Sequence, residues 1–411
     1  MSIVFMKVVL SVILLAVVGG VLWKKEYLTV LLKQKNVTLW LAIGWVIFRF
    51  LPFLAIYLVA GYAPTSDVNG FWDEASKAAE GQVVYRDFWS PYSPLYAYYL
   101  GTWLNVWYDP RMIVLLMTIM DALALYTSWY LYRAQMADFL YKSLLYYLLP
   151  GSIILCVVGA QEDVWMWFFV LVAYLLRQRT GRVEVYAFVL ALGLLLTKAI
   201  FVLILIPLFL IEKQKLRFVL LLSSVGVITL AILYPLVGWE FMQPMDEAKV
   251  LRAPNILSVL NPWFVDSIGV GEKFWNWVGL VLSLGLGSLT AWRFRNAGFV
   301  DMISRTWVAL YATMMVVQQS AYSNYIFLFL IPVVFYVIDW HNKREVGLLL
   351  LYNLLCVIHP SYWWRQGMPK YLTPSDIWAS TSTVVDYLMQ LGIVLLTGYF
   401  IRIATTDKRL L

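Results

Sequence analysis

Long uninterrupted apolar runs are the feature that most constrains how this chain folds. Segments 2–23, 37–60, 112–132 and 383–401 reach or approach the ~20 apolar residues that a spanning helix needs. Only 13% of the residues are charged, whereas about a quarter are charged in soluble domains. Backbone groups in hydrocarbon must pair within their own segment, and the runs lack the alternation typical of membrane β-barrels. We therefore predict an all-α polytopic membrane protein.

The basic residues predict how the helices are threaded through the membrane. Twenty of the 31 Lys and Arg residues fall in seven short patches that alternate with acidic loops, as the positive-inside rule describes. With these patches in the cytoplasm, we expect about 11–13 spans in a single transmembrane domain over 1–411. Residues 1–36 form a retained extra span followed by a cytoplasmic loop, and the C-terminus is cytoplasmic. Two large loops, 61–111 and 237–273, then lie outside, and fifteen of the 24 carboxylates fall in the external segments as a whole. The patches are 24–35, 133–142, 177–182, 213–217, 293–305, 343–344 and 402–409.

Two apolar segments do not fit a simple span. The run 93–107 is aromatic and interrupted, and we expect an interfacial or re-entrant helix there, because a crossing would place Arg133 outside. The run 184–211 has 28 residues, which is long for one span and short for two. It is flanked by basic patches, so we expect two short helices that meet near Lys198.

The first external loop concentrates acidic residues directly after a span. Five carboxylates lie between Ser66 and Leu95, and a helical pattern over 68–80 stops at Gly81. Asp67 precedes this pattern, so its carboxylate either caps the helix or is available for chemistry. Capping is the commoner role for a residue in this position.

Four more acids are candidates for the same site. Asp73 is spaced i, i+4 from Lys77, which is typical of an exposed ion pair, whereas Glu74 points elsewhere and is placed to face a site. Glu162 and Asp163 stand at the external mouth of two spans, either as an exposed helix cap or as a second acidic cluster. Two such clusters on one face can bind Mg²⁺ or Mn²⁺ through oxygen ligands, or divide the roles of general base and orienting group. The sequence leaves both open.

Cationic side chains near the membrane form the next group of candidates. Charges at membrane depth are costly and usually face the bundle interior, and we expect Arg49 and Asp121 to form a structural pair there. Lys198 is placed to bind the phosphate of an anionic lipid. Arg111 and Arg252 are external and close to the membrane, where they contact headgroups or stabilise a phosphate leaving group.

Aromatic residues are frequent in the external segments. Most of them fit the interfacial belt of a membrane protein, but rings beside carboxylates also suit a sugar, whose apolar faces stack on them. The substrate-binding candidates are Tyr85, Trp89 and Tyr325.

Charge and cysteine content argue against two other classes of protein. The net charge of +7 is accounted for by the cytoplasmic patches, so we expect no nucleic-acid partner. Cys156 and Cys356 both lie in apolar runs, as buried free thiols do. Neither they nor the two histidines have the spacing of a zinc site.

The order of these features resembles that of the GT-C fold glycosyltransferases, which use polyprenyl-phosphate sugars, and within them the family 87-like and GPI mannosyltransferase I-like enzymes. The matching residues of the first loop are Asp67, Phe71-Trp72 with Ala75 and Ala78-Ala79, Gly81, Tyr85 and Ser93-Pro94-Leu95. Later matches are Asp121 in MDALALY, Gln161-Glu162-Asp163, Leu196-Thr197-Lys198 with Pro207, and SAYSNYIFLFLIP at 320–332. The resemblance covers roughly residues 38–340, and the order and shared sidedness of the motifs carry it.

The resemblance implies a GT-C-like architecture with short extracytoplasmic juxtamembrane helices. It implies an inverting transfer of a monosaccharide, mannose or another hexose, from a polyprenyl-phosphate donor to a lipid- or glycan-linked acceptor hydroxyl, with Asp67 as general base on the outer side of the cell membrane. Asn69 stands where a DxD pair would have its second Asp, which leaves a divalent cation in doubt. The alternatives are a transporter or flippase of a lipid-linked sugar and a glycan polymerase or ligase. The sequence shows no matching second broken helix for a transporter, and its large external loops are not arginine-rich, as a polymerase would require.

Overall fold

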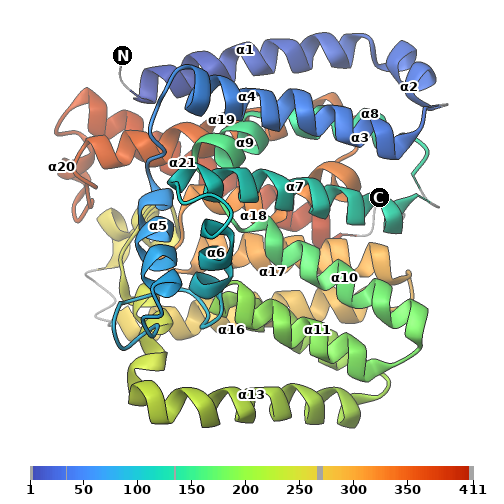
Figure 1. The fold of residues 1–411 in the computed structure, drawn as a ribbon. Helices are drawn as coiled ribbons and strands as arrows, with labels where there is room; N and C mark the ends of the chain where they lie inside the picture. Colours follow the sequence, from blue (N-terminus) through green and yellow to red (C-terminus); the bar gives the residue numbers. More distant parts are fainter. Residues whose placement is uncertain (1–2, 34, 134–135, 266–271, 407–411) are drawn as a thin grey trace. The chain divides into compact units, whose positions relative to one another are not determined.

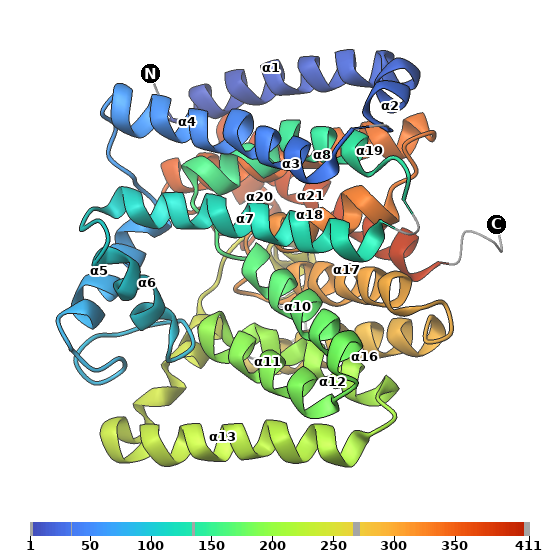
Figure 2. The same ribbon diagram turned by 45° about the vertical axis from the view of Figure 1, so that its right-hand side comes forward.

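A computed structural model of the chain describes residues 3–33, 35–133, 136–265 and 272–406 (Figures 1 and 2). In these residues the regular secondary structure is helical, and no strand is formed beyond one isolated bridge between Val84 and Phe88. This confirms the all-α fold that the apolar runs predict.

Eight helices in the described part are long and apolar enough to cross a membrane, or up to nine if one bent pair is counted as a span. They confirm a polytopic membrane protein. The eight are α1 (Ile3–Trp23), α3 to η2 (Val37–Val59), α7 (Pro110–Tyr132), α13 (Lys215–Val237) with η5 (Gly238–Lys249), α16 (Glu272–Arg293), α17 (Phe299–Val317), α19 (Lys343–Arg365) and α21 (Thr381–Thr405).

The number of long helices is smaller than the about 11–13 spans expected from the sequence, although each predicted run is helical. The predicted spans that are not counted are shorter helices and one pair of helices. The two helices of this pair meet at an angle of 70°, and Pro150 is the first residue of the second one. A helix of 14 residues is only ~21 Å long, whereas a span needs ~30 Å. An apolar run does not by itself show where its helix breaks. The helices concerned are α8 (Phe139–Leu148) with Pro150–Val158, α10 (Val164–Thr180), α11 (Val183–Leu196), Ala199–Ile211 and Ser323–Val337.

The chain divides into two compact units, each made of separate segments. Unit 1 comprises Met1–Lys25, Leu148–Ile154 and Ala248–Leu411, and unit 2 comprises Glu26–Tyr147 and Leu155–Glu247.

In unit 1, α17 packs between α16 and α21, and α19 packs against α21 and α1. A buried polar network ties α19 to α21. Asp386 accepts hydrogen bonds from Tyr371 (2.9 Å) and Gln390 (2.6 Å), and one of its oxygens lies 3.5 Å from Nε2 of His359. The smaller elements of this unit are α9 (Pro150–Ile153), α14 (Ile256–Leu260), η6 (Asn261–Val265), η7 (Ser323–Tyr325), α18 (Ile326–Pro332), η8 (Val333–Val337) and α20 (Pro374–Ile377).

In unit 2, α10 packs against α7 and α11, and α11 packs against α13 (Figures 1 and 2). Local sequence sets the ends of these helices. Asp109 caps α7 by accepting a hydrogen bond from the backbone of Arg111 at 2.8 Å. Gly181 ends α10 in the left-handed conformation (φ +68°), which glycine adopts without strain. The remaining elements are α2 (Lys25–Lys33), η1 (Val46–Phe50), α4 (Leu51–Phe53), η3 (Ile154–Val158), η4 (Ala199–Phe201) and α12 (Val202–Ile211). The first residues of α2 and η3, Lys25 and Ile154, are assigned to unit 1.

The first large loop folds into two short helices, α5 (Asp67–Ala79) and α6 (Tyr96–Leu104), which lie side by side (Figures 1 and 2). They approach so closely that a Cβ at Gly101 would lie 2.9 Å from the carbonyl oxygen of Ala75. The nine residues of α6 are too few to cross a membrane, as expected for 93–107.

Candidate functional site

Asp67 is the first residue of α5, and its side chain does not cap that helix. The N-cap position is Ser66, and no side chain accepts a hydrogen bond there. Instead, the Asp67 carboxylate accepts a hydrogen bond from Nε2 of Gln161, and the residue is exposed. The capping role that the sequence favoured is therefore wrong, and an oriented, accessible carboxylate stands in its place.

Two residues with unusual backbone conformations precede the acidic segments of the site. Ser66 has φ +65° and Ala160 has φ +47°, although neither is glycine. Such conformations cost about 1–3 kcal/mol each and persist where the surrounding structure enforces them, often at functional sites. One holds Asp67 at the start of its helix, and the other turns the chain into Gln161.

Glu162 and Asp163 lie at the start of α10 and are 2% and 0% exposed. Nζ of Lys198 lies 2.6 Å from Oε1 of Glu162 and 2.7 Å from Oδ1 of Asp163. Asp163 occupies the N-cap position without a side-chain capping bond. The exposed-cap interpretation of these two acids is thus wrong, because both are buried against one ammonium group.

Lys198 sits where the run 184–211 breaks, between α11 and η4, which confirms the pair of short helices expected there. The first loop is tied to this break by backbone hydrogen bonds, from Ser93 to the carbonyl of Thr197 (3.1 Å) and from Leu95 to that of Leu195 (3.0 Å). The end of a helix leaves carbonyl groups without intrahelical partners, and here the loop supplies them. The break therefore holds α5, α6 and Lys198 in one site.

Glu74 and Asp73 are neighbours in α5 with opposite environments. Glu74 is 5% exposed and its Oε2 accepts a hydrogen bond from Oγ of Ser90 at 2.6 Å. Burial raises the pKa of Glu74 to about 8, and the nearby carboxylates add to this effect while Ser90 opposes it. Asp73 instead forms an exposed ion pair with Lys77 at 2.6 Å. Glu74 thus faces the site, and Asp73 lies on the solvated face of the helix.

We call Asp67, Glu74, Glu162 and Asp163, together with Lys198, the acidic cluster. Burial raises the pKa of Glu162 to about 7, while Lys198 lowers it and Asp163 raises it further. The three buried carboxylates, Glu74, Glu162 and Asp163, outnumber the one ammonium group, so protons or a ligand must supply the difference.

Several buried polar atoms around the acidic cluster have no hydrogen-bond partner. Two are acceptors, Oε2 of Glu162 and Oδ2 of Asp163, and two are donors, the hydroxyl of Tyr96 and Nε1 of Trp165. The rings of Tyr96 and Trp165 are 5.8 Å apart. Burial, and then the nearby carboxylates, raise the pKa of Tyr96. Because more than nine in ten buried polar groups are normally paired, this grouping marks a place for a polar ligand or for water.

A divalent cation has no preformed ligand set in the part of the chain that the structure describes, where no group of three His, Cys, Asp or Glu side chains is arranged to hold one. Oxygen ligands for Mg²⁺ or Mn²⁺ are present in Glu162 and Asp163, but the ammonium group of Lys198 already lies against both. A cation would therefore have to displace Lys198.

Three other predicted site residues are not members of the acidic cluster. Arg111 pairs with Asp109 at 3.0 Å, and its buried Nε has no hydrogen-bond partner. Arg252 and Tyr325 belong to unit 1, where Arg252 stacks on Tyr322 at 4.5 Å. The acidic cluster is built from unit 2 alone.

The two predicted aromatics of the first loop differ in exposure. Tyr85 is 3% exposed and packs in an apolar cluster with Val84, Phe88 and Val237, and it also lines the open pocket on which Trp89 borders. Trp89 is 49% exposed and lines an open pocket of about 510 Å³.

This open pocket adjoins the acidic cluster through Ser90. The backbone N–H of Ser90 donates to Oε1 of Gln243, which lines the pocket, while its hydroxyl donates to Glu74. Ser90 alone would thus separate a ligand in the open pocket from the buried carboxyl group of Glu74.

Four residues of the site were not predicted from the sequence as site residues: Gln161, Ser90, Tyr96 and Trp165. Gln161 was the most accessible to prediction, because it directly precedes two acids that were identified. Tyr96 and Trp165 stand in aromatic-rich segments where nothing distinguishes them from an interfacial belt.

The geometry of unit 2 therefore provides an exposed carboxylate beside a buried, incompletely paired group of acids. Comparisons with protein-family models, with curated proteins and with solved structures find no match to this chain.

Proposed function

We propose that this protein is a membrane glycosyltransferase that moves a monosaccharide from a polyprenyl-phosphate donor to an acceptor hydroxyl. The observation that carries the proposal is the carboxylate of Asp67, which is exposed, caps no helix and is oriented by Gln161. The reaction class comes from the order of sequence motifs, which resembles that of GT-C enzymes. A hexose such as mannose is the expected sugar.

In the proposed reaction, Asp67 takes the proton of the acceptor hydroxyl while that oxygen attacks the anomeric carbon of the sugar. The bond from this carbon to the phosphate oxygen breaks, and the lipid phosphate leaves with the electron pair. A positioned general base contributes about 10²–10⁴-fold to such a step. Gln161 serves as the positioning residue, because its amide fixes one oxygen of the carboxylate.

We assign the unpartnered polar atoms beside Asp67 to the transferred sugar. A sugar hydroxyl donates and accepts, and the site offers both acceptors (Glu162 and Asp163) and donors (Tyr96 and Trp165). Satisfying buried polar groups of both kinds favours a neutral polyhydroxylated ligand over a second anion. In this assignment Lys198 offsets one of the two negative charges of these acids.

The phosphate and the acceptor are assigned to features outside the acidic cluster. Arg111 is the better candidate for the donor phosphate, because its Nε is buried and unpartnered, whereas Lys198 is shared by two carboxylates. The open pocket lined by Trp89 suits the acceptor, since an exposed indole can stack on a sugar face. On the basis of the basic patches, we place the reaction on the extracytoplasmic side and the C-terminus in the cytoplasm.

The test is a transfer assay with the full-length protein in lipid nanodiscs. Radiolabelled polyprenyl-phosphate hexoses are supplied with a membrane lipid extract as acceptor. We expect wild-type transfer, a loss of about 10²-fold or more in Asp67→Asn, and a change of less than about twofold in Asp73→Asn. Asp73 is the matched control, because it is an aspartate of the same helix in an exposed ion pair.

Two results would contradict the proposal. Full activity in Asp67→Asn would remove Asp67 as the base, and no transfer with any donor would remove the reaction. In the second case, donor movement across proteoliposomes would favour a flippase, and extension of a glycan chain from an oligosaccharide-lipid donor would favour a polymerase or ligase. Repeating the assay with a chelator decides whether Mg²⁺ or Mn²⁺ takes part.

A further inference from the structure

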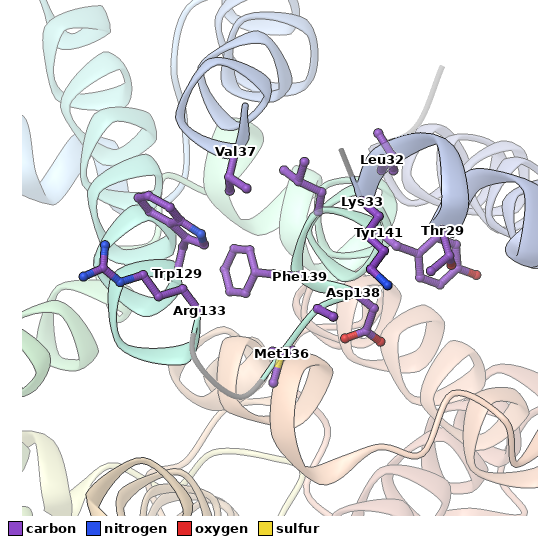
Figure 3. Close-up of a pocket in the computed structure, with 12 residues that line it drawn as sticks. Thr29, Leu32, Lys33, Val37, Trp129, Arg133, Met136, Asp138, Phe139 and Tyr141 are labelled. Atoms are coloured by element: carbon purple, nitrogen blue, oxygen red, sulfur yellow. The ribbon is translucent and has the colours of Figure 1, made fainter. Parts of the chain in front are cut away.

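A second pocket in unit 2 lies away from the acidic cluster and brings together basic patches that are far apart in the sequence. It has a volume of about 240 Å³ and is lined by the end of α2, the first residue of α3, the end of α7 and the start of α8. Lys33 and Arg133 are its cationic residues, and its large aromatic residues are Trp129, Phe139 and Tyr141 (Figure 3).

The polar side chains other than Arg133 gather on one side of this pocket. Figure 3 shows Lys33, Thr29, Tyr141 and Asp138 on one side of Phe139, with Trp129 and Arg133 on the other. The pocket therefore has one side rich in polar groups and another where the indole of Trp129 adjoins a single cation, Arg133, as an amphiphilic ligand with an anionic headgroup would require.

Two hydroxyl groups that line the pocket are unpartnered. Tyr141 is 1% exposed, and neither its hydroxyl nor that of Thr29 has a hydrogen-bond partner. A buried hydroxyl without a partner is unfavourable, so a bound acceptor group in the pocket would stabilise the protein. An oxyanion is such an acceptor.

The charges around the pocket favour an anion. In the described residues neither Lys33 nor Arg133 forms an ion pair, and Arg133 stacks on Tyr130 at 4.0 Å, with Arg179 on the same ring at 5.6 Å. The one carboxylate that lines the pocket, Asp138, is paired with Lys142 at 3.4 Å. The net charge around the pocket is thus positive. It comes from residues of three separate basic patches.

We propose that this pocket binds the phosphate of an anionic phospholipid, with Lys33 and Tyr141 as its main ligands. The phosphate oxygens lie against Lys33, Tyr141 and Thr29, and the glyceride part lies against Trp129 and Phe139. Basic pockets between helices of membrane proteins suit such headgroups. This lipid is separate from the substrates of the proposed transfer reaction, and its binding does not depend on that reaction.

The test is a lipid titration of the full-length, delipidated protein in detergent, followed by native mass spectrometry. The probes are phosphatidylglycerol, phosphatidylcholine and inorganic phosphate. We expect phosphatidylglycerol to bind most tightly, Lys33→Gln to weaken it about fivefold, and Tyr141→Phe to weaken it about tenfold through loss of one charge-assisted hydrogen bond.

Lys35→Gln is the matched control, because Lys35 is an exposed lysine two residues away that does not line the pocket. Its affinity should equal that of the wild type. The exposed Lys33 keeps the test valid if Tyr141→Phe folds poorly. Equal phosphatidylglycerol affinity in wild type, Lys33→Gln and Lys35→Gln would overturn the proposal, as would binding of inorganic phosphate as tight as that of the lipid or no preference over phosphatidylcholine.

Discussion

Unit 2 contains two buried groups of charged residues that differ in how completely they are paired. In the first, Nε of Arg49 lies 2.8 Å from Oδ2 of Asp121, and the hydroxyl of Tyr146 donates to the other carboxylate oxygen. Arg49 also stacks on Tyr147 at 5.0 Å. The charges of this closed group cancel, and both oxygens of Asp121 have partners.

The acidic cluster is the opposite case. Lys198 faces both Glu162 and Asp163, and each acid keeps an oxygen with no hydrogen bond. A buried charge needs pairing and hydrogen bonding to be tolerated, so the closed group stabilises the fold as it stands, while the acidic cluster is complete only with protons or a ligand. The difference separates a structural ion pair from a candidate site.

The largest effect on stability is expected at the closed group. Asp121→Asn leaves Arg49 as an uncompensated buried charge, which destabilises by about 3–5 kcal/mol. Thermal unfolding in detergent measures this loss. The double variant Arg49→Met with Asp121→Leu should recover most of it, because no buried charge remains. A wild-type unfolding temperature in Asp121→Asn would show that the pair is not structural.

Removing one acid from the acidic cluster should affect activity and leave stability intact, the reverse of the effect at the closed group. Asp163→Asn leaves one carboxylate for Lys198, so the unfolding temperature should stay the same or rise. If Asp163 binds the sugar, transfer activity should fall about 10-fold or more, since a hydrogen bond to a charged group contributes about 1.5–3 kcal/mol. A loss of stability as large as that of Asp121→Asn would contradict the distinction between the two groups.

The pH dependence of stability tests the burial of Glu74. Its pKa is raised from 4.5 to about 8 in the folded protein. Between these values the folded state holds a proton that the unfolded state has released, so stability falls as pH rises from about 4.5 to about 8. Unfolding temperatures measured from pH 5 to 9 should show a decline that is reduced in Glu74→Gln. An identical slope in the variant would mean that Glu74 is ionised and solvated in the folded protein.

The smallest effect is expected on the exposed face of α5. Lys77→Gln breaks the ion pair with Asp73, whose side chains are 35% and 60% exposed. Pairs of this kind contribute about 0.3–0.5 kcal/mol, and salt weakens them. The unfolding temperature should barely move, and 0.5 M salt should abolish the difference. A larger loss would mean that this face packs against another part of the protein.

Much of the fold was predictable because the membrane imposes strong rules on sequence. Apolar length predicted the helices, the interrupted run 184–211 predicted the break at Lys198, and the cost of charge at membrane depth predicted the pair of Arg49 and Asp121. The spans were harder to count, since a proline bend or a short helix leaves hydropathy almost unchanged.

The sequence by itself determined that this chain forms apolar helices with acids and bases segregated along it. Only the tertiary structure decided which acids meet, that Asp67 turns from its own helix to Gln161, 94 residues away, and that Tyr85 is buried while Trp89 is open. Hydropathy acts on each segment locally, whereas a side chain's partners depend on helices that approach from elsewhere in the chain. An acid that caps a helix and an acid that serves a site look alike until those neighbours are in place.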